Sequence, residues 1–152
     1  MTRQLRVFWV GILIYVVSFF LIATQFIGMG FWSPWFGFLA ALYALWLPWS
    51  GGWVVVHWGV FDSYFKWVAL LVSGWINPVF IVAAFLDLSG QYPRTVAVLR
   101  IVIPVMIPFC WFFFAFMLMY PREGHFAWVA GMLMVLFSRK IEERWARREV
   151  FS

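Results

Sequence analysis

Few residues in this sequence are suited to chemistry, and an amide within an apolar run is the first of them. Asn77 precedes Pro78 near the middle of the stretch from Trp67 to Leu86. An amide beside a helix break can present polar groups to a ligand at the middle of a membrane. The alternative is that Asn77 hydrogen-bonds a neighbouring helix at a kink, the common use of such an amide. We favour the alternative and keep Asn77 as a ligand candidate.

A second group combines two imidazoles with carboxylates and consists of His57, Asp62, Lys66, Glu123 and His125. Such groups bind transition metals, and histidine is an axial ligand of haem and related rings. No HExxH or CxxC spacing accompanies them, and Asp62 and Lys66 are placed to pair at i, i+4. We therefore assign no metal ligand and no catalytic residue. The cofactor is left unknown, with a tetrapyrrole or a metal as an alternative, and His57 and His125 are kept as candidates.

Tryptophan is abundant around the middle of the first half of the chain. Many of the twelve tryptophans fall there, namely Trp32, Trp35, Trp46, Trp49, Trp53 and Trp58. This grouping predicts an aromatic belt at the membrane interface, and the alternative is an aromatic surface for a lipid tail, cofactor or partner helix. Trp53 and Trp58 flank His57 and complete the set of ligand candidates.

Composition places these residues in a membrane protein. The chain is 66% hydrophobic and only 11% charged, so a water-soluble fold could not cover its apolar surface. The net charge of +5 comes from residues beside apolar runs, which favours anionic lipids over nucleic acid as the partner. We assign headgroup contacts to five basic residues near the C-terminus: Arg139, Lys140, Arg144, Arg147 and Arg148.

The apolar runs predict one all-α transmembrane domain over residues 1–152, built as a four-helix bundle with a broken re-entrant or interfacial hairpin. Ser33-Pro34 is typical of a helix start, and the segment from Pro48 to Gly52 of a break. One kinked span and two thin crossings are the alternatives for the hairpin. The expected spans are 7–29, 66–87, 96–119 and 125–140, with the hairpin at 34–61 and a cytoplasmic amphipathic helical tail at 139–152.

The basic residues predict how the chain is oriented. Lys and Arg near a membrane concentrate on the cytoplasmic side. With Arg100 set aside inside a span, a hairpin that returns to its own side divides them eight to two, whereas a fifth crossing divides them six to four. The stronger asymmetry favours both termini in the cytoplasm. We expect Arg100 to extend toward the cytoplasmic surface.

Two short motifs resemble a pattern in small uncharacterised bacterial multi-pass proteins. These are Ser73-Gly74-Trp75-Ile76-Asn77-Pro78 and, after the next span, Gly124-His125-Phe126-Ala127-Trp128. The resemblance covers the C-terminal half. It implies a bacterial inner-membrane protein with four spans and carries no activity. The hydrophobic stretch 31–61 departs from that pattern, in which a more polar outer loop is expected.

These observations favour a non-enzymatic accessory or scaffolding subunit of a larger membrane complex. Small-residue faces for close helix packing, either within the chain or against another subunit, are expected at Ala40, Ala41 and Ala44 and at Ala127 with Gly131. The alternative is a protein that binds or transports a small ligand, cofactor or lipid through Asn77 and the tryptophan-rich hairpin. No nucleophile stands at an evident relay spacing from a base, so we do not expect an enzyme.

Overall fold

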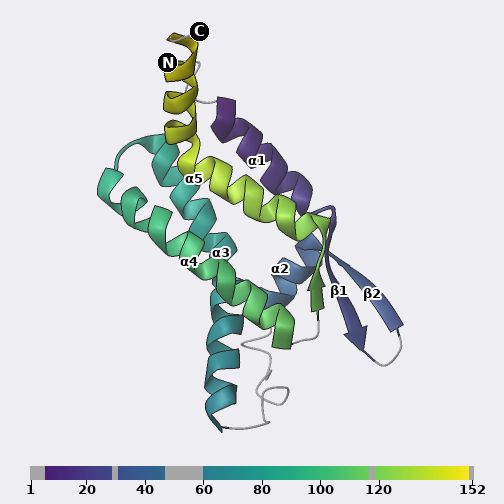
Figure 1. Ribbon diagram of the computed structural model, residues 1–152. Helices are drawn as coiled ribbons and strands as arrows, with labels where there is room; N and C mark the ends of the chain where they lie inside the picture. The colour runs from purple at the N-terminus through teal and green to yellow at the C-terminus, as the bar shows by residue number, and fades with distance from the viewer. Residues whose placement is uncertain (1–5, 29–30, 47–59, 117–118, 151–152) are drawn as a thin grey trace.

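The computed structural model describes residues 6–28, 31–46, 60–116 and 119–150. Five helices make up most of this part of the chain, and three short strands form one sheet beside them (Figure 1). The all-α class is therefore confirmed. In chain order the elements are α1 (Arg6–Ser18), β1 (Ile22–Gly28), β2 (Phe31–Phe36), α2 (Gly37–Trp46), α3 (Val60–Ser89), α4 (Pro93–Phe116), β3 (Met119–Pro121) and α5 (Glu123–Val150).

Two helices are long and apolar enough to cross a membrane. They are the Tyr64–Ser89 part of α3 and the Pro93–Ala115 part of α4, which contain the spans expected at 66–87 and, up to Ala115, at 96–119. Pro78 lies inside α3, and Pro104 and Pro108 lie inside α4, so both helices continue through their prolines.

A tight turn joins α3 to α4. Gly90 has φ +69°, and its N–H donates to the Leu86 carbonyl at 3.1 Å. This is the left-handed C-terminal cap that glycine provides without a Cβ penalty. Pro93 then begins α4, where its fixed φ suits the first helical turn. The short connection makes α3 and α4 antiparallel neighbours.

The first apolar run is not one helix. We expected a span over 7–29, but α1 ends at Ser18, whose hydroxyl donates to the Tyr15 carbonyl in the last turn. The chain then continues as β1, the central strand of a sheet ordered β2-β1-β3. An uncharged run rich in aromatic and β-branched residues suits either structure, and pairing with two other strands decides it here.

The helix start expected at Ser33-Pro34 is also absent. Both residues lie in β2, where Pro34 is opposite Gln25 of β1. Because β2 is an edge strand, proline costs no hydrogen bond on its unpaired side. The helix α2 begins three residues later at Gly37 and ends at Trp46, just before Pro48. Residues 47–59 of the predicted hairpin lie outside the described residues.

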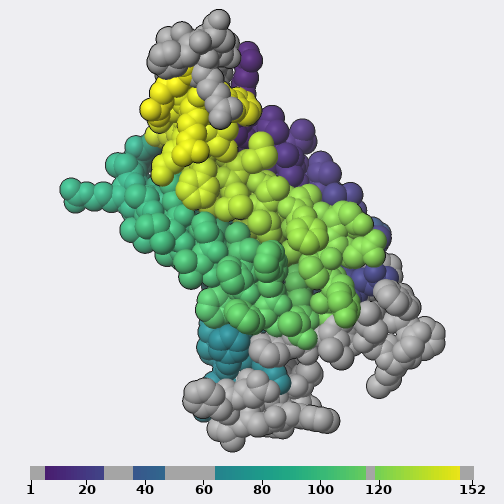
Figure 2. All heavy atoms as spheres, viewed as in Figure 1, coloured from purple at the N-terminus to yellow at the C-terminus, as the bar shows by residue number. Residues whose placement is uncertain are grey.

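The small-residue faces pack within this chain. A Cβ added at Gly131 of α5 would lie 2.6 Å from the Tyr15 nitrogen of α1, and one added at Gly74 of α3 would lie 2.5 Å from the Ala44 carbonyl oxygen of α2. These glycines therefore let the helix backbones touch. Figures 1 and 2 show α1 lying along the first half of α5, with α4 on the other side of α5.

A side chain of α5 also caps α1. Glu142 accepts a hydrogen bond from the main-chain N–H of Val7 at 2.9 Å, which satisfies one of the free donors at the start of α1. α1 and α5 thus run antiparallel and join the two ends of the chain. Between α1, α3, α4 and α5 lies the main core, whose fully buried members include Ile76, Phe80, Ile103, Met132 and Val135.

Candidate functional site

Asn77 sits where three helices meet. Its Oδ1 accepts one hydrogen bond from the Tyr15 hydroxyl of α1 at 2.9 Å and another from Nε1 of Trp128 in α5 at 2.8 Å. The amide oxygen has two lone pairs, and these contacts use both. Among the described residues its NH2 group has no acceptor. Asn77 therefore joins the helices and retains two unused donors.

His125 is buried in the first turns of α5, with 4% of its surface exposed. Its Nε2 lies 2.7 Å from Nε1 of Trp111 in α4. Because the indole N–H can only donate, Nε2 must accept, and the neutral ring carries its proton on Nδ1. The rings of Phe114 and Trp128 pack against it, with centroids 4.8 Å and 5.1 Å away. The Nε2 lone pair is thus occupied, and the second nitrogen is a donor.

One cavity of about 60 Å³ brings Asn77 and His125 together. A cavity needs roughly 10–15 Å³ to hold one water molecule, so this one has room for several waters or for a small polar group. The walls are mostly apolar, and their polar members are Ser18, Thr24, Ser73, Asn77 and His125, besides the Tyr43 hydroxyl and the Trp128 indole. Thr24 is only 1% exposed, and its Oγ1 has no hydrogen-bond partner within the described part of the chain. A buried hydroxyl without a partner is uncommon, and a bound polar group beside it is one explanation.

The polar groups around the cavity are mainly donors. Asn77 offers its NH2 and His125 its Nδ1–H, since their acceptor atoms are occupied. Thr24 Oγ1 can donate or accept, whereas Ser73 donates to the Ala69 carbonyl at 2.6 Å and its hydroxyl is also paired with the Cys110 thiol. This set matches a neutral ligand group that has an acceptor oxygen. A free carboxylate is disfavoured because no described lining residue is Lys or Arg.

The other candidate residues are not brought to this cavity by the described structure. His57, Trp53 and Trp58 lie outside the described residues, and so does the side chain of Asp62. Within the ranges described, no three His, Cys, Asp or Glu residues gather as a metal site. The Glu123 carboxylate pairs with Arg122 at 3.1 Å, away from the buried imidazole, and this hydrogen-bonded pairing lowers the pKa of Glu123.

Arg122 joins the central strand β1 to the beginning of α5. Its Nη1 donates to the Gln25 side-chain oxygen of β1 at 2.8 Å, and its main-chain N–H donates to the Ala23 carbonyl at 2.8 Å. These bonds hold β1, which carries Thr24, against the beginning of the helix that carries His125. The position of the cavity wall therefore depends on an arginine outside the cavity.

The basic residues near the C-terminus differ in their surroundings. The Arg139 guanidinium contacts Asp87 at 3.1 Å, and its side chain is 58% exposed, so the predicted headgroup contact stays a prediction. Lys140 lies 5.9 Å from the centre of the Phe137 ring, and Arg144 and Arg147 are exposed. The side chain of Arg148 lies outside the described residues. Arg100, which we expect to extend toward the cytoplasmic surface, binds Asp87 through two contacts of 3.2 Å.

Several important residues had no distinguishing pattern in the sequence. Tyr15 and Trp128 look like ordinary members of apolar runs, and Thr24 like a small polar residue in one. The available signal was that Asn77 is the only asparagine, inside a run that offers few other polar groups. A buried amide needs partners, and aromatic residues with an N–H or O–H are the partners that an apolar bundle can supply.

Replacing Asn77 by alanine should destabilise the bundle. The Tyr15 hydroxyl and the Trp128 indole would both lose their acceptor, and we expect a loss of about 1–2 kcal/mol, since interhelical hydrogen bonds in membranes contribute modestly. Unfolding of the purified protein in mixed micelles, followed by circular dichroism, measures it. The control Gln91→Ala removes an exposed amide and should change little. Equal stability of Asn77→Ala and Gln91→Ala would contradict the assigned hydrogen bonds.

Comparison with known proteins adds no relative. No protein-family model, curated protein or solved structure matches this chain. The fold and the site define a class only: an all-α chain with two helices long and apolar enough to cross a membrane and a small, mostly apolar cavity that is partly open. The resemblance to small bacterial multi-pass proteins stays a prediction.

Proposed function

We propose that this chain is a non-enzymatic integral membrane protein that binds a small neutral ligand in the cavity between Asn77 and His125. The observation that carries the proposal is the buried Thr24 hydroxyl, which has no partner among the described residues and lines the same cavity as two unused donor groups. A site prepared for an acceptor oxygen explains all three. The cavity volume of about 60 Å³ accommodates only the polar end of a ligand, such as a carbonyl with its neighbouring carbon.

The remainder of such a ligand would lie along apolar walls. Phe19, Phe113 and Phe114 line the cavity together with Ala40 and Ala41. These side chains suit a hydrocarbon tail, so the ligand class that fits is a neutral amphiphile with a carbonyl, ester or hydroxyl end. The bilayer itself contains such molecules at high concentration.

The membrane arrangement that we propose retains four spans with both termini in the bacterial cytoplasm. α3 and α4 are two of the crossings, and α1 and α5 supply the others together with the chain around them. Support comes from the contacts that collect basic residues at one end of the molecule: Asp87 meets Arg100 and Arg139 there, and Glu142 reaches Val7. Cytoplasmic enrichment of Lys and Arg would place that end inside.

An accessory role in a larger membrane complex is the second proposal from the sequence. It depended on small-residue faces being available for partners. Gly131 packs on Tyr15 and Ala44 packs on Gly74, so both faces have contacts within the chain. A ligand-binding role uses the described geometry more fully, and we place it first.

Filling the cavity should abolish ligand retention. Ala41 lines the cavity, and Ala41→Leu adds three carbons there, whereas Ala130→Leu makes the same change at an exposed position of α5. Each protein is purified in mild detergent and extracted with organic solvent for mass spectrometry. We expect the wild type and Ala130→Leu to release one neutral oxygen-bearing compound, and Ala41→Leu about tenfold less, corresponding to about 1.4 kcal/mol. Equal release from all three would contradict the proposal.

A further inference from the structure

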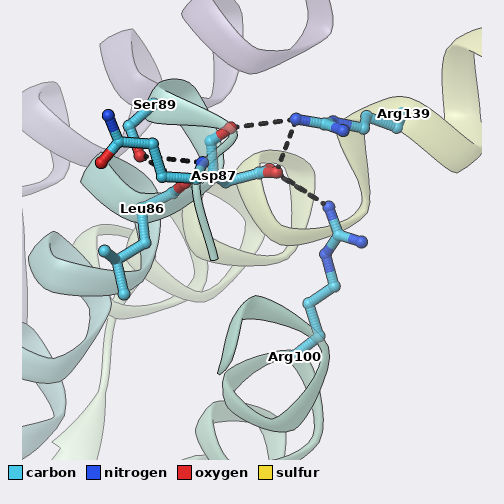
Figure 3. A network of polar contacts seen from close by, with 6 residues as sticks. Leu86, Asp87, Ser89, Arg100 and Arg139 are labelled. Carbon is cyan, nitrogen blue, oxygen red and sulfur yellow. Dashed lines mark hydrogen bonds and ion pairs between the residues drawn. The ribbon is translucent and has the colours of Figure 1, made fainter. Parts of the chain in front are cut away.

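A cluster of three charged side chains lies far along the helices from the cavity, where α3, α4 and α5 meet. Arg100 Nη2 lies 3.2 Å from both carboxylate oxygens of Asp87. Arg139 Nη2 lies 3.1 Å from Asp87 Oδ1 and donates to the Asp87 main-chain oxygen at 2.9 Å. Figure 3 shows the two guanidiniums reaching Asp87 from different helices. One carboxylate therefore joins two cations.

The cluster carries one surplus positive charge. The Asp87 side chain is 8% exposed, and Arg100 alone would neutralise it. Among the described residues, the acidic side chains of α5 form no ion pair with this cluster: Glu142 Oε1 accepts from the Val7 N–H, Glu142 Oε2 is buried without a partner, and Glu143 is exposed to solvent. Lys140 and Arg144 add further positive charge on the same helix. An anion is the species that would complete this arrangement.

The unused hydrogen bonds of the cluster indicate what kind of anion fits. Each guanidinium has five N–H donors, and the contacts to Asp87 engage one nitrogen of each. Arg100 Nε has no acceptor among the described residues but is itself buried, so the donors open to an anion are those of Arg139, whose side chain is 58% exposed. A phosphate has several acceptor oxygens arranged for the fork of an arginine, so it matches these donors better than a single-oxygen acceptor does.

We propose that Asp87, Arg100 and Arg139 form a binding site for the phosphate group of an anionic phospholipid headgroup. Asp87 holds the two guanidiniums at the ends of their helices, and Arg139 presents its exposed donors to the phosphate. Arg100, which is less exposed than Arg139, adds a second positive charge on the buried side of the site. Free inorganic phosphate offers the same chemistry and is distinguished by the experiment. The site does not depend on the ligand cavity.

The test compares two arginines of α5 that differ in their contacts. Arg139→Gln leaves the Asp87–Arg100 pair neutral, and Arg144→Gln removes an exposed arginine outside the cluster. Binding of phosphatidylglycerol and of phosphatidylcholine to the delipidated protein is measured by native mass spectrometry. We expect Arg144→Gln to weaken phosphatidylglycerol binding by about fivefold at most, the effect of one charge near the surface. Arg139→Gln should weaken it well beyond that, with little change for phosphatidylcholine.

Further measurements separate a phosphate site from general attraction. Arg139→Lys keeps the charge and loses the fork, so it should bind phosphatidylglycerol less tightly than the wild type while circular dichroism shows an intact fold. A lipid site should retain phosphatidylglycerol in millimolar inorganic phosphate, whereas full displacement by inorganic phosphate would overturn the lipid as its ligand. Equal losses in Arg139→Gln and Arg144→Gln, or full binding by Arg139→Lys, would overturn the proposal.

Discussion

Gly131→Val should be among the most destabilising substitutions in this chain. A Cβ at this position would lie 2.6 Å from the Tyr15 main-chain nitrogen and 2.9 Å from the Gly11 carbonyl oxygen. Those atoms belong to the α1 backbone and cannot move aside as a flexible side chain can. We expect the free energy of unfolding to fall by about 3 kcal/mol, the upper part of the range for overpacking.

The matched control is the neighbouring residue. Ala130 is exposed on α5, so Ala130→Val introduces the same β-branched side chain without a clash. It should cost about 0.5 kcal/mol through helix propensity alone. Unfolding of both variants in mixed micelles, followed by circular dichroism, measures the difference. If Gly131→Val were as stable as Ala130→Val, α1 and α5 would not pack through this glycine.

Asp87→Asn should have an effect of similar size for a different reason. The substitution removes the only carboxylate in contact with Arg100 and Arg139 in the described structure. Removing one partner of a buried pair leaves the opposite charge without compensation, and we expect a loss of about 3 kcal/mol because Arg100 remains partly exposed. Thermal or detergent-induced unfolding of the purified protein measures it.

Two further variants identify the cause of that loss. Glu143→Gln removes an exposed carboxylate of α5 and should change stability by less than about 0.5 kcal/mol. The double variant Asp87→Asn with Arg100→Gln removes the uncompensated charge and should recover part of the stability. A double variant less stable than Asp87→Asn alone would show that charge compensation is not the reason.

The sequence predicts the long helices better than the short elements. α3 and α4 lie on apolar runs of spanning length that contain few charges, and such runs have few alternatives. The run after Ser18 has the same apolar character but becomes β1, because its partners β2 and β3 lie elsewhere in the chain. Hydrophobicity alone therefore cannot separate a long span from a short helix followed by a strand.

The candidate site shows the same contrast: the sequence identifies single polar residues, but not the residues that they contact. Asn77 is recognisable as a rare amide in an apolar run. Its hydrogen-bond donors Tyr15 and Trp128 are 62 and 51 residues away, and no local pattern relates them to it. His125 is recognisable as one of two histidines, but its burial against Trp111 depends on how α4 and α5 pack. Polar residues can be found from sequence, whereas their pairing follows from tertiary structure.

The charge cluster follows this pattern as well. Asp87 and Arg100 are visible as charged residues on either side of a turn, and the capped turn at Gly90 brings their helices together. Arg139 looks like one of several basic residues after the last apolar run. The way in which α5 packs against α3 brings Arg139, and not Arg144, into contact with Asp87.

The central claim is that Asn77 presents unused donors to a ligand in the cavity, and NMR tests it most directly. Asn77 is the only asparagine, so protein labelled with ¹⁵N-asparagine gives one pair of side-chain amide signals. We predict that these signals shift when the protein is delipidated, and that Ala41→Leu resembles the delipidated protein before any treatment. Signals that stay unchanged by delipidation and identical in Ala41→Leu would contradict a ligand at Asn77.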